Sequence, residues 1–121
     1  TNYAGTITTN SQSPIVNFSG AIINNSSDNA DIGTIYNNDI INNYNGATIN
    51  NNSGGVINNN SDAEIINNFS ATITNNSGAT ITNNQTIANS GTINNSGTIN
   101  GSGSINPKGT INDSGTCNQC A

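Results

Sequence analysis

The chain has 121 residues and a net charge of −5, with a single cationic side chain and no histidine. A surface for phosphate backbones or anionic lipid is therefore excluded. General acid–base and nucleophilic catalysis need clustered histidine, cysteine, lysine or paired carboxylates, and a chain with no histidine, no arginine and one lysine offers few of them, which argues against an enzyme. Hydrophobic residues make up only 31% of the chain and aromatic residues 4%, so a globular core of ordinary size is not expected.

Isoleucine recurs at fixed intervals along the chain, and such periodicity predicts a repeat architecture. The spacing is eight residues from Ile7 to Ile23 and again from Ile41 to Ile81, and six residues from Ile81 to Cys117. We divide the looser stretch between them into two nine-residue units, 21–29 and 30–38, with Ile32 in the repeated position of the second. The sequence thus predicts one domain over residues 1–121, with mainly eight-residue units over 5–78 and six-residue units over 79–120.

Each eight-residue unit begins with a small residue and carries isoleucine at its third position and asparagine at its fifth. Alternate residues of a strand share one face, so we assign these three positions to the interior. The Asn, Ser and Gly residues that follow favour a turn. The predicted core ladder is Ile49, Ile57, Ile65, Ile73, Ile81, Ile87, Ile93, Ile99, Ile105 and Ile111, and the predicted asparagine ladder is Asn43, Asn51, Asn59, Asn67 and Asn75.

A unit of this length cannot bury its own isoleucine, but stacked coils can, and asparagines in register can hydrogen-bond along the stack. We therefore predict an all-β, single-chain parallel β-solenoid. Two or three units could close one coil. The outward aliphatic residues Ile22, Ile40 and Val56 share one side only when two units form a coil, which favours two and would make them a lateral interface; a three-sided β-helix is the alternative.

The segments Phe18-Ser19-Gly20-Ala21-Ile22 and Gly54-Gly55-Val56-Ile57 and the serial Gly-Thr-Ile-Asn-Asn-Ser units resemble repeats of bacterial extracellular β-helical surface proteins. These include autotransporter passenger domains and polymorphic membrane proteins. The resemblance spans nearly the whole chain, and it implies a β-helical fold and a place at the cell surface rather than a specific activity.

Cys117 and Cys120 form a Cys-x-x-Cys pair in the last unit, without the βαβ context of a redox enzyme. A disulfide within the last coil and disulfides between subunits both fit, whereas zinc would need ligands from a second chain. No cofactor or metal site is predicted. Outward threonines are expected around the whole perimeter rather than along one face, which does not favour an ice-binding surface.

The sequence shows no evident capping segment, and an uncapped solenoid leaves unpaired strand edges that invite another copy. We expect a secreted, processed chain, extracellular or at the cell surface, that forms a homopolymer by head-to-tail stacking as part of a filament, sheath or matrix. Phe18, Tyr44 and Phe69 at corners could add lateral contacts. The alternative is a binding module, such as an adhesin segment or an ice-binding protein, with a glycan or surface ligand. Nucleic acid is not expected as a partner of so acidic a chain. Membrane insertion is not expected either, since no apolar run approaches the length of a spanning helix.

Overall fold

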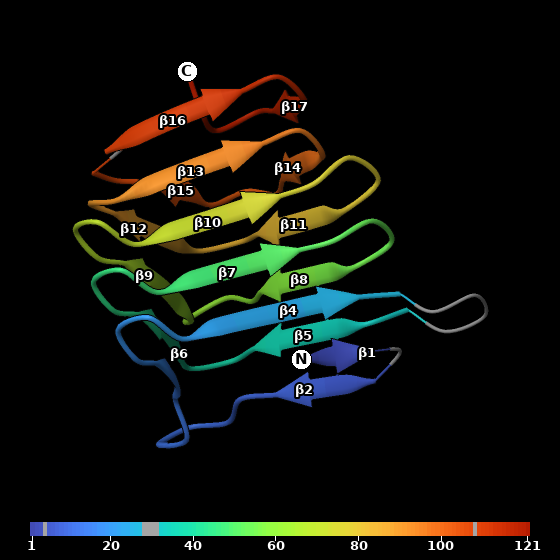
Figure 1. The fold of residues 1–121 in the computed structure, drawn as a ribbon, viewed down its shortest axis with the longest axis vertical. Helices are drawn as coiled ribbons and strands as arrows, with labels where there is room; N and C mark the ends of the chain where they lie inside the picture. Colours follow the sequence, from blue (N-terminus) through green and yellow to red (C-terminus); the bar gives the residue numbers. More distant parts are fainter. Residues whose placement is uncertain (4, 28–31, 108) are drawn as a thin grey trace.

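The computed structural model describes residues 1–3, 5–27, 32–107 and 109–121, and in these ranges every regular element is a β-strand. The strands form three parallel sheets, and the strands of each sheet lie one above another along the long axis of a rod (Figure 1). Sheet A contains β1 (Asn2–Tyr3), β4 (Ile22–Ser26), β7 (Thr48–Asn51), β10 (Thr72–Asn75), β13 (Thr92–Asn95) and β16 (Thr110–Asp113). Sheet B contains β2 (Thr6–Thr8), β5 (Thr34–Asn37), β8 (Val56–Asn59), β11 (Thr80–Asn83), β14 (Thr98–Asn100) and β17 (Thr116–Cys117). Sheet C contains β3 (Ile15–Asn17), β6 (Ile40–Asn43), β9 (Glu64–Asn67), β12 (Thr86–Asn89) and β15 (Ser104–Ile105).

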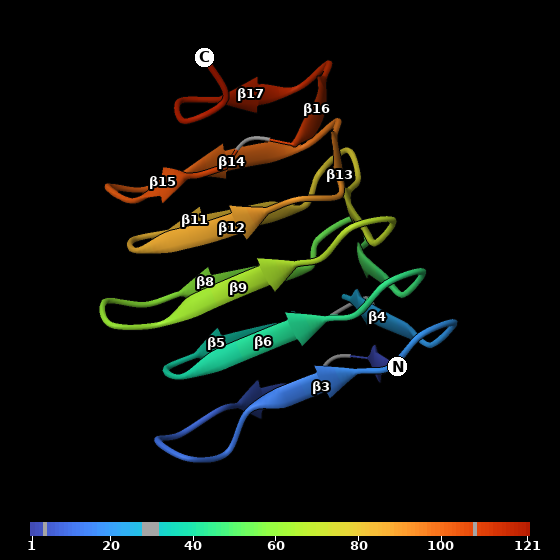
Figure 2. The same cartoon turned by 90° about the vertical axis from the view of Figure 1, so that its left-hand side faces the viewer.

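Three consecutive strands complete one coil of the solenoid. Each strand pairs with the strand three places along the chain, as β7 does with β10 and β10 with β13, and Figure 2 shows the coils rising from the N-terminal to the C-terminal end. The column residues Asn51 and Asn75 are 24 residues apart, and Asn95 and Asp113 are 18 apart, as three eight-residue and three six-residue units require. The prediction of a solenoid is confirmed, but the preference for two units per coil is wrong, and the three-sided alternative is correct.

The strand register places isoleucine on isoleucine. Ile73, for example, pairs with Ile49 in one neighbouring coil and with Ile93 in the other. Neighbouring strands lie about 4.8 Å apart, so the inward isoleucines of each sheet form a continuous apolar row along the rod. A single coil could not form such a row alone. The three rows meet along the axis of the rod and form its core.

One irregular unit differs from its predicted alignment. Ile32 is 59% exposed, and Ile35 occupies the interior position, where it pairs with Ile7 and Ile57. The unit begins at Gly33, where a Cβ atom would overlap the Ser26 carbonyl oxygen, so only glycine fits. Residues 28–31, which include Ala30 as the predicted start of this unit, lie outside the described ranges.

From residue 91 onward every six-residue unit begins with glycine, whereas several of the eight-residue units begin with alanine. Ala63 and Ala71 begin eight-residue units and are buried. In the six-residue units the corner is shorter, and a Cβ atom on Gly97 would overlap the carbonyl oxygens of both Asn76 and Ala79. At Gly97 the short corner therefore brings the backbones too close for any side chain.

Across the part of the chain that the structure describes, no helix has the length and apolar character needed to span a membrane.

Candidate functional site

The core ladder follows the prediction over most of its length. The first nine predicted residues, from Ile49 to Ile105, are at most 3% exposed, and Ile35 and Ile41 extend the same core toward the N-terminus. Ile111, the last predicted member, lies in the final coil and is only partly buried.

Three columns of polar side chains run beside the core, one at the end of each sheet's strands. Column A contains Asn2, Asn25, Asn51, Asn75 and Asn95, column B contains Thr9, Asn37, Asn59 and Asn83, and column C contains Asn17, Asn43, Asn67 and Asn89. Within each column, the side-chain amide nitrogen of one asparagine donates to Oδ1 of the next asparagine. These distances are 2.7–2.9 Å for the donors from Asn2 to Asn75. The predicted asparagine ladder is therefore confirmed.

Each column asparagine also ties one sheet to the next. Asn51 Nδ2, at the end of a sheet A strand, donates to the Thr80 carbonyl oxygen of sheet B at 2.9 Å as well as to Asn75 Oδ1. Asn59 makes the equivalent pair of contacts to Asn83 and to the Thr86 carbonyl of sheet C. Asn51 and Asn59 are fully buried, and no buried side-chain polar atom of the described residues lacks a hydrogen bond. The amide is thus an internal brace of the corner, and its burial costs little because both of its polar atoms are paired.

The columns are longer than the sequence predicted. Asn37, Asn83, Asn89 and Asn95 are also buried and belong to them. All four lie two residues after a buried isoleucine, the same offset as in the eight-residue units. That offset was the signal that could have identified them in the six-residue repeats as well.

The C-terminal end carries a cap that the sequence did not reveal. Column A ends at Asp113, whose Oδ1 accepts from Asn95 Nδ2 at 2.7 Å. Column B ends at Gln119, whose Oε1 accepts from Asn83 Nδ2 at 2.8 Å and whose Nε2 donates to the Asn83 carbonyl at 3.0 Å. Gly101 stands where the next column B asparagine would be, two residues after Ile99, and leaves room for the glutamine. This cap ends two of the polar columns but leaves β16 as the edge strand of sheet A, so the expectation of an open strand edge is not overturned.

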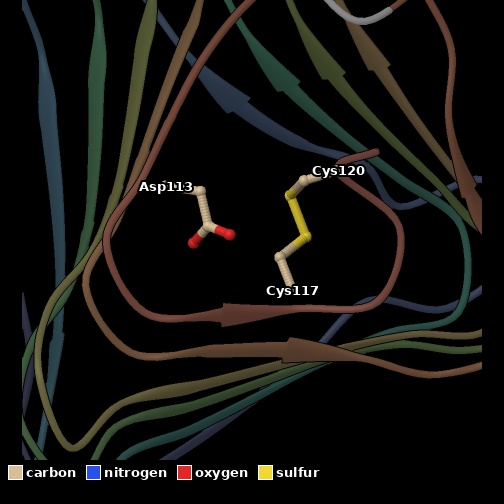
Figure 3. A group of neighbouring side chains, drawn as sticks. All are labelled: Asp113, Cys117 and Cys120. Carbon is tan, nitrogen blue, oxygen red and sulfur yellow. A yellow bond between two sulfur atoms is a disulfide. The ribbon is translucent and has the colours of Figure 1, made fainter.

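Cys117 and Cys120 form a disulfide within the last coil. Cys117 pairs with Ile99 in the strand register, so the sulfur atoms cover the end of the isoleucine core. In Figure 3 the Asp113 carboxylate and the disulfide face one another inside the final bend of the chain. Ligand atoms of the three side chains all lie within 4.8 Å of one another. The end of the rod thus gathers the chain's only two cysteines and one of its six acidic residues.

Reducing this disulfide is expected to loosen the last coil and leave the middle of the rod unchanged. A cross-link closing so short a loop stabilises by about 2 kcal/mol in the chain-entropy description, or about thirtyfold in a local opening equilibrium. Hydrogen exchange should therefore accelerate by about that factor at the Thr116 amide, which donates to the Gly97 carbonyl. The Thr80 amide, which donates to the Gly55 carbonyl in a central coil, is the internal reference. Equal acceleration at both amides would contradict a local role.

The predicted lateral interface does not exist as one surface. Ile22 lies on β4 of sheet A, Ile40 on β6 of sheet C and Val56 on β8 of sheet B. A coil of three sides distributes these positions over all three faces, whereas a coil of two sides would have aligned them.

Aromatic side chains gather instead along one corner of the rod. Phe18, Tyr44 and Phe69 follow β3, β6 and β9, three successive strands of sheet C. The Phe18 and Tyr44 rings are stacked, with centroids 6.0 Å apart and planes 6° apart. Phe18 is 70% and Phe69 72% exposed. We call this set the aromatic corner; Phe18 and Tyr44 contact each other, and exposed aromatic residues along one corner are a candidate contact surface.

Outward threonines are more ordered than expected. Successive strands of sheet A carry an outward threonine at the same register position, and each threonine is next to an isoleucine of the inward row. These threonines are Thr48, Thr72, Thr92 and Thr110. The expectation that threonine is not confined to one face is nevertheless confirmed, because Thr80, Thr98 and Thr116 form a second row on sheet B. It followed from the consecutive units of Thr72 and Thr80, which do lie on different sheets.

Comparisons with protein-family models, with curated proteins and with solved structures found no match for this chain.

Proposed function

We propose that the chain is a structural subunit of an extracellular filament, sheath or matrix. The observation that carries this proposal is the repetition of the same two contacts, isoleucine on isoleucine and asparagine on asparagine, from coil to coil along the rod. These contacts depend on stacking rather than on a globular interior, so a rod of this kind can add copies without changing its internal packing.

The proposed route of assembly is head-to-tail stacking of copies. At the N-terminal end Ile7, Ile15 and Ile23 are only partly buried, and at the C-terminal end Ile111 and Cys117 are only partly buried. Contact between the two ends would cover both apolar surfaces and would place β1 of one copy against β16 of the next, where each has an unpaired backbone edge. Such a contact is heterologous and does not close, so it extends into a filament.

The two ends match only in part. Column residues Thr9 and Asn37 in the first coils are 28 residues apart, whereas Asn95 and Asp113 in the last are 18 apart, so a junction joins coils of different size. Every column amide donates toward the C-terminal end, but an ionised Asp113 has no proton to donate onward. The junction would therefore rest on apolar and backbone contacts, and it would be weaker than the contact between coils within one chain.

Replacing Asp113 by asparagine is expected to strengthen end-to-end association. The amide nitrogen introduced by Asp113→Asn could donate to Asn2 Oδ1 of the next copy and so continue column A, while the side-chain oxygen retained at this position would still accept from Asn95. One added hydrogen bond of about 1 kcal/mol predicts an association constant about fivefold higher, measured by sedimentation velocity over a concentration series. The matched control is Asp62→Asn, which removes the same charge at an exposed turn. Equal association of both variants would contradict continuation of the column.

The aromatic corner offers the lateral contact that a sheath or matrix needs. Its rings project from a corner whose neighbouring turn residues are Ser19, Asn45 and Ser70. We assign it to pairing of parallel rods, because burial of aromatic rings against a second copy yields far more free energy than burial of the surrounding small polar residues.

The test of the structural proposal is electron microscopy of the purified chain at rising concentration, with sedimentation to quantify polymer. Filaments of rod-like subunits are expected, with bundling reduced when Phe18 and Phe69 are both replaced by serine. A monodisperse monomer at the highest concentration reached would overturn the proposal.

A second candidate function is ice binding by sheet A. The specific observation is the row of in-register threonines from Thr48 to Thr110, whose hydroxyl and methyl groups repeat at the strand spacing of about 4.8 Å. Thermal hysteresis by the monomer, lost when Thr72 and Thr92 are replaced by a bulky residue such as lysine, would favour this candidate over the structural one.

A further inference from the structure

A group of metal-ligating atoms lies at the C-terminal end of the rod, on the surface that the proposed end-to-end contact would cover. The Asp113 carboxylate and the two cysteine sulfur atoms come within 4.8 Å of one another, although the sequence places only the cysteines in a recognisable motif. Asp113 comes from the end of β16 and Cys117 from β17, so the turn between these strands brings the third group in (Figure 3).

The Asp113 carboxylate is held in place by the solenoid itself. Its Oδ1 accepts from Asn95 Nδ2 at 2.7 Å and from the Gly115 backbone amide at 3.2 Å. Asn95 is the last asparagine of column A, where every amide donates in the same direction, so the donor end of an aligned series of dipoles meets the carboxylate. Hydrogen bonds of this kind orient a ligating carboxylate, and they leave its second oxygen as a donor atom for a metal.

We propose that the reduced chain binds one thiophilic divalent cation, such as Zn²⁺ or Cd²⁺, through Cys117, Cys120 and Asp113. Two thiolates and one carboxylate give three protein ligands, and water completes a tetrahedral site of the open kind. Zinc binding within a single chain thereby becomes feasible, whereas the sequence alone supplied two ligands and called for a second chain.

The disulfide and the metal exclude each other, because the same two sulfur atoms serve both. Reduction breaks the S–S bond with two electrons and two protons, for example from a phosphine that is oxidised to its oxide with water as the oxygen source. Binding of the cation then releases the two thiol protons, since thiolates are the ligands. The site is therefore occupied only under reducing conditions and is closed by oxidation.

The probe is Cd²⁺, titrated into dilute full-length chain that has been reduced with a phosphine under anaerobic conditions. Thiolate-to-metal charge-transfer absorbance in the ultraviolet is expected to saturate at one cation per chain. The oxidised chain and the Cys117→Ser and Cys120→Ser variants should show no such signal. Asp113→Asn keeps the acceptor for Asn95 but removes the carboxylate, and it should weaken binding by about tenfold or more, because even an outer partner of a metal ligand is worth at least that much.

Asp62→Asn is the matched control, since it makes the same chemical change at an exposed turn away from the cysteines. It should leave the affinity unchanged. Saturation at one cation per two chains would instead place the site between subunits, and equal affinities of the Asp113 and Asp62 variants would reduce it to a bare thiolate pair. Either result would overturn the proposal, as would absence of the charge-transfer signal in the reduced chain. Failure of filament formation would leave this result unaffected.

Discussion

Replacing Asn51 by alanine is expected to lower the free energy of unfolding by about 2–6 kcal/mol, because it removes the hydrogen bonds that Asn51 donates to two buried acceptors, Asn75 Oδ1 and the Thr80 carbonyl, at about 1–3 kcal/mol each. Asn51 is fully buried, accepts from Asn25 Nδ2 at 2.9 Å and donates to Asn75 Oδ1 at 2.9 Å. It also donates to the Thr80 carbonyl. The measurement is equilibrium denaturation in guanidinium followed by circular dichroism.

The matched control for this substitution is the adjacent residue. Asn50 lies on the same strand but faces outward, where its amide donates to Asn24 Oδ1 at the surface. Water can replace that partner, so Asn50→Ala should cost no more than about 1 kcal/mol. Equal losses for the two variants would mean that the columns do not stabilise the rod more than any surface hydrogen bond.

Replacing Ile73 by alanine is expected to cost about 2–5 kcal/mol, the range for truncating a large buried aliphatic side chain. Ile73 is 2% exposed and lies between Ile49 and Ile93 in its row. The backbone ladders on both sides fix the distance between coils, so the cavity left by the missing atoms cannot close, which favours the upper part of the range. The same denaturation experiment measures it.

Ile22→Ala is the control for the core substitution, because it removes the same atoms from a side chain that is 57% exposed. A loss of less than about 1 kcal/mol is expected there. A comparable loss at both positions would contradict the assignment of the Ile73 row to the core.

The periodicity of the sequence was sufficient to predict the interior of the rod. Strands such as β7 and β10 alternate outward and buried residues as predicted, because a strand has only two faces and isoleucine and asparagine repeat on the same one. Nothing in that alternation depends on how many strands close a coil, which is why the same spacing fitted two sides and three. The preference for two units per coil depended on the outward residues Ile22, Ile40 and Val56. Single aliphatic residues at a surface are common and carry little information about the fold.

The cap could not be predicted from the repeat because it departs from it. Gln119 lies 36 residues from Asn83 along the chain and reaches it only because the last coil returns over Gly101. The approach of Asp113 to the cysteines depends on the same return. Side chains brought together by the end of a repeat leave no periodic signal, so the candidate metal site emerged only from the three-dimensional structure.

The central claim is that buried asparagine columns and isoleucine rows hold a core-poor chain in a three-sided rod. Hydrogen exchange of the asparagine side-chain amides, resolved by NMR, tests it most directly. We expect slow exchange for the column amides of Asn51, Asn59 and Asn67, and rapid exchange for outward amides such as that of Asn50. Uniformly rapid exchange of all asparagine side chains would contradict the account.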